Sequence, residues 1–130
     1  MSNEGVTSHD ETTFPIVSLF NEAGVESTSF APTHISFGGK AKGVGQAVAV
    51  QSNGQVVVGG IINDAPPIFS GLARLDANGD LDTTFGNGGA VTFDNSVSAL
   101  LIDATGDIVA VEAPGPTGGD GIVLQRYLAN

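Results

Sequence analysis

Apolar residues in this chain occur in short runs, several of which alternate with small or polar residues. In residues 46–51 two valines alternate with their neighbours, which is the period of two expected of a β-strand with one buried face. Asn53 and Gly54 follow, and an Asn-Gly pair between two apolar runs predicts a tight hairpin turn in which both residues take positive φ. The apolar run at 55–62 is then the second strand of this hairpin.

Two more strands are predicted after the hairpin. Residues 70–76 form the third strand, Asn78 and Gly79 provide a second turn, and residues 90–93 form the fourth strand. Four short strands within residues 46–93 are typical of one blade of a β-propeller. The pattern therefore predicts an all-β fold made of propeller-like, four-stranded units.

The chain also repeats itself, at a shift of about 55 residues and again at about 52, a period typical of stacked or radial repeats. FPIVSLFNEAG at 14–24 aligns with FSGLARLDANG at 69–79, and AVAVQSNGQVVV at 47–58 aligns with ALLIDATGDIVA at 99–110. We expect a disordered tail at 1–13 and a single repeat domain at 14–130, with a partial copy at 14–37, a full copy at 46–93 and a partial copy at 97–130.

The full copy carries a family resemblance. AVAVQSNGQVVVGG followed by LARLDANGDLDTTFGNGGAVTF, within 46–93, resembles the delta-60 repeat of bacterial proteins. The resemblance implies β-propeller blades and no particular activity, and it implies that the glycines, the Leu-Asp pair and the Phe of the motif are architectural. The first copy departs from the motif because it has SLF in place of ARL and lacks a Gly after Phe30.

The predicted strands do not make a whole number of blades. From residue 14 onward they number nine, or a little over two blades per chain, whereas a propeller closes with at least four. We expect identical chains to join side by side into a ring, as a trimer or alternatively a dimer, since cyclic symmetry leaves no open edge. A fragment of a longer repeat protein, or a β-sandwich built by two chains, is the alternative.

Composition narrows the function classes. The 130 residues suit one small domain, and fourteen acidic against four basic side chains give a formal charge of −10, so nucleic acid and anionic membranes are not expected partners. The absence of Cys excludes disulfides and cysteine-rich zinc sites. No signal peptide or membrane span is recognisable, so a cytoplasmic location is the default expectation and the compartment stays open.

One stretch has the spacing of a calcium loop. Asp76, Asn78, Asp80 and Asp82 offer oxygen ligands at alternate positions, as Ca²⁺ prefers. However, the Gly and the terminal acid are not where an EF-hand requires them, and the first copy loses most of these oxygens while keeping its Gly and Phe. We therefore favour a turn in which the side chains bond to local backbone N–H groups, and expect no metal cofactor.

A catalytic site is not expected. His34 is the one histidine outside the N-terminal tail, and no Gly-x-Ser-x-Gly elbow is present to supply a nucleophile. We interpret His34 as an exposed loop residue. A hydrolase working with paired carboxylates is the enzymatic alternative.

A non-catalytic binding or structural module is the remaining class. The loops that follow the second strand of each unit contain Asn63, Asp64 and Asp120, and these are the candidate ligand-binding residues. A lectin-like propeller with a glycan partner is one alternative, although the chain has no Trp and a single Tyr, Tyr127, for stacking on a sugar. A calcium-stabilised surface protein is another. We favour a scaffold or protein-interaction module whose protein partner docks on the acidic loops.

Overall fold

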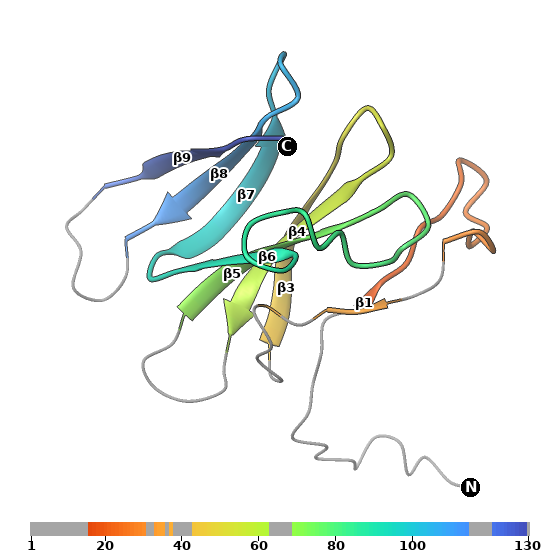
Figure 1. Ribbon diagram of the computed structural model, residues 1–130, viewed down its shortest axis with the longest axis horizontal. Helices are drawn as coiled ribbons and strands as arrows, with labels where there is room; N and C mark the ends of the chain where they lie inside the picture. The colour runs from red at the N-terminus through yellow and green to blue at the C-terminus, as the bar shows by residue number, and fades with distance from the viewer. Residues whose placement is uncertain are drawn as a thin grey trace, which may run out of the picture.

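A computed structural model describes residues 16–30, 33–35, 37, 43–62, 69–114 and 121–129. The expected tail at 1–13 lies outside these residues. The described part of the chain consists of strands and turns (Figure 1). Its strands are β1 (Ile16–Val17), β2 (Thr33–His34), β3 (Gly43–Val50), β4 (Val56–Ile62), β5 (Phe69–Leu75), β6 (Ala90–Phe93), β7 (Ser96–Ile102), β8 (Ile108–Ala113) and β9 (Val123–Tyr127).

The strands form three antiparallel sheets in which each strand pairs with the next along the chain. They are the N-terminal pair β1-β2, the central sheet β3-β4-β5-β6 and the C-terminal sheet β7-β8-β9. The prediction of an all-β, four-stranded unit is confirmed, and β6 has the predicted bounds. β3 begins at Gly43 rather than at residue 46, because its ladder with β4 continues to the pair Gly43–Ile62. No helix that could cross a membrane is found among the described residues.

The first hairpin turn differs from its prediction. Gly54 has φ +89°, but no non-glycine residue of the described chain has positive φ, so Asn53 does not. Gly54 N donates to Gln51 O at 2.9 Å, and Gln51 N donates to Gln55 O at 2.8 Å. This loop is one residue longer than the predicted two-residue turn, and in such a loop only the last turn residue must be left-handed.

The same five-residue turn occurs four times within the described residues. Its first residue accepts a hydrogen bond from a glycine three positions later and donates to the residue after that glycine. The glycines have φ between +78° and +94°, a conformation that costs little only for Gly. The four turns are Asn21–Val25, Gln51–Gln55, Asp76–Asp80 and Asp103–Asp107.

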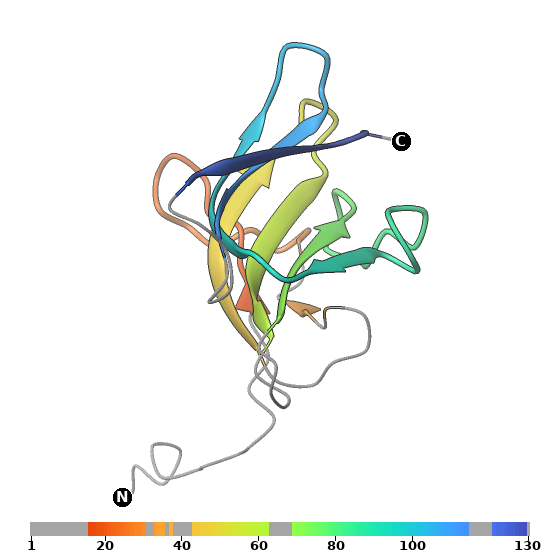
Figure 2. The ribbon, with the colours of Figure 1, turned by 90° about the vertical axis from the view of Figure 1, so that its left-hand side faces the viewer.

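The central sheet lies between the other two sheets. In Figures 1 and 2 the C-terminal sheet lies to one side of it and β1 to the other. Each of its two faces therefore has its own apolar core. Toward the N-terminal pair the core consists of Phe30, Ile35, Phe37, Val56, Val58, Ile62, Ala73 and Leu75. Toward the C-terminal sheet it consists of Val57, Leu72, Phe85, Val97, Leu100, Ile108 and Ala110.

Glycines in the strands let these layers approach closely. A Cβ added at Gly71 would lie 2.9 Å from the Cβ of Phe37, and one added at Gly59 would lie 2.9 Å from Cγ1 of Val97. Both distances are shorter than side chains tolerate, so the bare backbone is what admits Phe37 on one face and Val97 on the other. The strand glycines are architectural, as the family resemblance implied.

The copies share irregularities as well as strands. The ladder of β3 with β4 shifts register between Gly45 and Ala47, and the ladder of β7 with β8 shifts between Val97 and Ala99. These positions align at the shift of about 52 residues found in the sequence. Because a β-bulge changes the direction of its strand, β3 and β7 are expected to bend at equivalent positions of the repeat.

Candidate functional site

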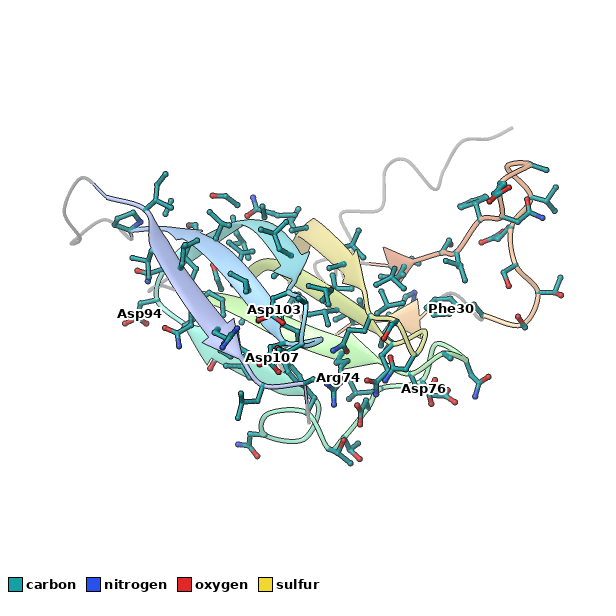
Figure 3. The ribbon with its side chains drawn as sticks, turned by 90° about the horizontal axis from the view of Figure 1, so that it is seen from above. Phe30, Arg74, Asp76, Asp94, Asp103 and Asp107 are labelled. Atoms are coloured by element: carbon teal, nitrogen blue, oxygen red, sulfur yellow. The ribbon has the colours of Figure 1, made fainter. Side chains whose placement is uncertain are left out.

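Three of the turns meet at one end of the molecule. Gln51 Nε2 donates to the carbonyl of Gly106 at 2.9 Å, and Gln55 Nε2 donates to Asp82 Oδ2 at 2.9 Å. We call the loops Gln51–Gln55, 76–82 and Asp103–Asp107 the turn edge. Figure 3 shows Asp76, Asp103 and Asp107 there, around Arg74, and shows Asp94 well apart from them. The turn edge gathers most of the acids singled out in the sequence.

Arg74 is buried at the centre of the turn edge. Its Nε lies 2.7 Å from Asp82 Oδ2, and the two side chains are only 2% and 11% exposed. Its guanidinium carbon lies 4.8 Å from the centroid of the Phe85 ring, within cation–π range, and its Nη1 donates to the carbonyl of Ala129. Arg74 therefore ties the Leu-Asp pair and the Phe of the motif to the end of the chain.

Both partners of this ion pair belong to the repeat motif. Arg74 belongs to the ARL piece of the motif and Asp82 to its Leu-Asp pair. The turn between them brings the two backbones together, since Asp82 N donates to Arg74 O at 2.9 Å. An arginine and an aspartate that flank a predicted hairpin turn are candidates for such a pair.

Asp82 is held as a carboxylate. Burial raises its pKa, but hydrogen bonds from the side chain and backbone of Thr84 and from Arg74, together with the charge of Arg74, lower the pKa below its ordinary value. Oδ1 accepts hydrogen bonds from Thr84 N at 3.0 Å and from Thr84 Oγ1 at 2.6 Å. Oδ2 accepts hydrogen bonds from Arg74 Nε and Gln55 Nε2. Both oxygens thus have structural partners.

The other calcium candidates lie in the turn itself. Asp76 Oδ1 accepts from Asn78 N at 2.8 Å and from Asp80 N at 3.0 Å, as the turn interpretation predicts. In the first copy Asn21 Oδ1 accepts from Ala23 N and Val25 N in the same way. Within the described residues no group of three or more His, Cys, Asp and Glu is placed to hold a metal ion. That the chain has no metal cofactor stays a prediction, with calcium as its alternative.

Asp103 repeats this arrangement in the third copy. Its Oδ1 accepts from Thr105 N and Asp107 N, and Arg126 donates to its Oδ2. The hydrogen bond from the Thr105 side chain, with those from the Thr105 backbone and Arg126, outweighs burial and holds the pKa of Asp103 well below its ordinary value. Arg126 is 59% exposed, so this pair is solvated, unlike the one at Arg74.

A buried acid lies away from the turn edge. Glu112, in the otherwise apolar β8, is 2% exposed. It accepts from Asn95 Nδ2 at 2.9 Å and from the Tyr127 hydroxyl at 3.3 Å. Burial, then the charge of Glu112 and its hydrogen bond, raise the pKa of Tyr127 well above its ordinary value, and the Tyr127 ring stacks on Phe93 at 6.1 Å. Sequence analysis missed Glu112, whose signal is an acid within an apolar strand.

The remaining candidates are placed as follows. Asn63, Asp64 and Asp120 lie outside the described residues. His34 is exposed, as expected, but lies in β2 rather than in a loop. Tyr127 lies in β9 and is turned into the core between the sheets, so its ring packs on Phe93 instead of forming an open stacking surface.

Both ends of the stack of sheets leave apolar surface uncovered. One of these surfaces lies on the side of the C-terminal sheet that faces away from the central sheet, and we call it the outer face. It consists of cross-strand neighbours, namely Ala99, Leu101, Val109, Val111, Leu124 and Arg126. Leu101 and Leu124 are 56% and 67% exposed.

The second uncovered surface lies at the opposite end of the stack, on β3. Val48 is 58% exposed there and lines an open hollow of about 380 Å³. We call it the β3 hollow, lined by Ile16, Val17, Ser18, Gly45, Gln46, Ala47, Val48 and Val58.

Comparison with known proteins places the central copy in a family context. Residues 51–85 match a family described as a domain of unknown function (DUF5122) beta-propeller. The match covers the first turn, β4, β5 and the segment up to Phe85. No curated protein and no solved structure matched the chain. A propeller-type, all-β repeat of unknown function is therefore the description that fold and comparison share.

Proposed function

We propose that this chain is a non-catalytic structural or binding module that joins with identical chains into a propeller-like ring. The observation that carries the proposal is the uncovered apolar surface at both ends of the stack, on the outer face and at the β3 hollow. The delta-60 resemblance of the sequence and the match over residues 51–85 both support a blade-like unit that needs neighbours.

Covering the exposed apolar side chains would stabilise an assembly. Burying a Val or Leu side chain that was exposed stabilises an assembly by about 1.5–3 kcal/mol. Leu101, Leu124 and Val48 are each more than half exposed, so a contact that buries all three offsets a substantial part of the entropy lost on association. Ring closure also pairs the open edge of β9, which otherwise invites aggregation.

The chemistry of the turn edge supports a role without catalysis. The oxygens of Asp76, Asp82 and Asp103 accept backbone, threonine or arginine hydrogen bonds that hold the turns and the end of the chain. Acids engaged in this way build a rigid edge. If each chain supplies two units, a trimer makes a six-unit ring, which we favour over a dimer.

Light scattering on a sizing column tests the proposal. We expect a trimeric mass, or a dimeric mass if the ring is smaller, across a range of protein concentrations. A chain that remains monomeric at the highest concentration contradicts the proposal. Repeating the run with a chelator separates the calcium question, since loss of the assembled mass with chelator would show that a bound divalent ion stabilises the ring.

A further inference from the structure

The two uncovered surfaces correspond to the two halves of an interface that the molecule already contains. Inside the chain the central sheet presents Val57 and Leu72 to the C-terminal sheet. Their equivalents, about 52 residues later, are Val109 and Leu124, which lie on the outer face. The outer face is therefore the same side of the repeat as the covered side of the central sheet, and no unit of the described residues covers it.

The β3 hollow corresponds to the other half. The C-terminal sheet presents Val97, Leu100 and Ala110 to the central sheet. Their equivalents are Gly45, Val48 and Val58, which line the hollow. The N-terminal pair covers the core around Val58, but this pair contains only the third and fourth strands of a unit, so β3 stays uncovered.

The closest contact between the central and C-terminal sheets joins a glycine of the central sheet to a valine of the C-terminal sheet. At the equivalent positions of the two uncovered surfaces the valine and the glycine have changed places. A Cβ at Gly59 would lie 2.9 Å from Val97 Cγ1 and 3.4 Å from Leu100 Cδ1. The equivalent of Gly59 on the outer face is Val111, and the equivalent of Val97 in the hollow is Gly45. Within the chain Gly59 contacts Val97, and between copies Val111 would contact Gly45. Each contact pairs one valine with one glycine, so the outer face of one copy fits the β3 hollow of another.

The strand edges are also complementary. By the repeat, Val17, Leu72 and Leu124 are equivalent, so β1, β5 and β9 are all third strands. Among the described strands β5 has neighbours on both sides, whereas β9 pairs with β8 alone and β1 with β2 alone. Within the described residues no fourth strand pairs with β9, and β2 is a fourth strand paired with β1 over two residues.

We propose that β9 of one copy replaces β1 of the next copy beside β2. The strands β7, β8 and β9 of the first copy and β2 of the second then form one complete four-stranded unit, packed on the second copy's central sheet through the outer face and the β3 hollow. This inference rests on the proposed ring. Of the nine strands in the described residues β1 is the surplus one, and each chain supplies two complete units.

If β9 of one copy replaces β1 of the next copy, the residues that pair between the two copies follow from the pairs that β1 makes. β1 pairs Ile16 with His34 and Val17 with Thr33, so β9 pairs Val123 with His34 and Leu124 with Thr33 of the next copy. Arg126 then takes the place of Leu19 near Phe30, the equivalent of Phe85. Because Arg74 lies over the Phe85 ring, Arg126 is expected to cover Phe30 in the same way.

Cysteine cross-linking between copies tests the docking. The chain has no Cys, so Val48→Cys and Val111→Cys each add a single thiol, treated with a short bis-maleimide. We expect covalent dimers in the mixture of the two variants and none with either variant alone. Val25→Cys, at a residue 60% exposed on a turn outside both surfaces, is the control and should not cross-link to Val111→Cys.

The results of cross-linking, together with the mass in solution, distinguish failure of the head-to-tail docking from failure of the proposed ring. Assembly without a cross-link in the mixture, or cross-linking of Val111→Cys with itself, overturns head-to-tail docking but leaves the ring. A monomeric chain overturns both. Cross-linking in the mixture supports the docking.

A matched pair of proline variants tests the strand exchange. Val17→Pro and Leu124→Pro change equivalent positions in β1 and β9, and Pro removes an N–H and disrupts a strand. We expect Leu124→Pro to reduce the fraction of chains in the assembled state at least tenfold and Val17→Pro to leave that fraction unchanged, with circular dichroism checking that both variants remain folded. Equal loss with both variants, or loss with Val17→Pro alone, overturns the exchange. If either variant unfolds, Leu124→Glu and Val17→Glu replace the pair with the same expectations.

Discussion

Arg74 in the central sheet and Arg126 in the C-terminal sheet occupy equivalent positions of the repeat and have different surroundings. Arg74 is 2% exposed, paired with Asp82 and placed over Phe85. Arg126 is 59% exposed and bonds to Asp103 in solvent. The strands that carry them are alike, so the difference lies in what covers each sheet. Each face of a copy is buried only where a neighbouring unit packs on it.

Removing the two arginines should give the largest contrast. Arg74→Ala leaves the Asp82 carboxylate buried without its cation, so we expect a loss of about 3–5 kcal/mol in the free energy of unfolding. Arg126→Ala breaks a solvated pair and should cost at most about 1 kcal/mol. Urea unfolding at neutral pH measures both values. Equal losses would show that the burial of Arg74 does not determine its contribution.

The leucines on the same two strands give the next contrast. Leu72 is fully buried, and Leu72→Ala should cost about 2–5 kcal/mol because it leaves a cavity between the sheets. Leu124→Ala should change the stability of the dilute monomer by less than about 0.5 kcal/mol, as is usual for surface changes. The two values are compared by thermal unfolding at low protein concentration. At assembling concentrations Leu124→Ala should become destabilising, which sharpens the comparison.

The turn glycines give a smaller contrast. Gly54 and Gly106 both have φ +89°, and an alanine in that conformation costs about 1–2 kcal/mol. A Cβ at Gly54 would also lie 3.2 Å from the Cβ of Ala77, whereas nothing lies within 4 Å of one at Gly106. Gly54→Ala should therefore be slightly the more destabilising in urea unfolding. Gly121→Ala, at an open site without positive φ, is the control and should be neutral.

The smallest effect is expected from the charge of Asp103. Its pKa is below the ordinary value of 3.8 in the folded chain, so its contribution is present above about pH 3.8 and is lost as the pH falls through the lower folded pKa. Asp103→Asn keeps the turn, as Asn21 does in the first copy, and should reduce the fall in melting temperature between pH 5 and pH 2.5. An unchanged fall would assign the acid sensitivity to other carboxyls, such as Asp82.

Sequence analysis recovered the local structure of the central copy. The alternation of apolar residues predicted the strands, Gly54 has the positive φ that was expected, and a turn is present at Gly79 as predicted. The φ of Asn53 was predicted wrongly, because two-residue and three-residue hairpin loops share the same Asn-Gly signal. The β-bulge after Gly45 was not predicted, since a bulge depends on the partner strand as much as on its own sequence.

Only some of the contacts in the turn edge were predicted from the sequence. The bonds of Asp76 to its own turn follow from local chain geometry and were expected. The pair of Arg74 with Asp82 and the burial of Glu112 were missed because they depend on neighbouring strands and on what packs above them. Sequence periodicity indicates which side of a strand a residue occupies and does not indicate whether that side is covered.

The sequence by itself determined that this chain is built from repeated, twisted β-units with left-handed glycines in their turns, because these features depend on residues close together in the chain. Only the tertiary structure decided which copies are covered. Leu72 and Leu124 share a place in the repeat, yet one is fully buried and the other is 67% exposed. Burial depends on the presence of a next unit, which the pattern of a single strand does not encode.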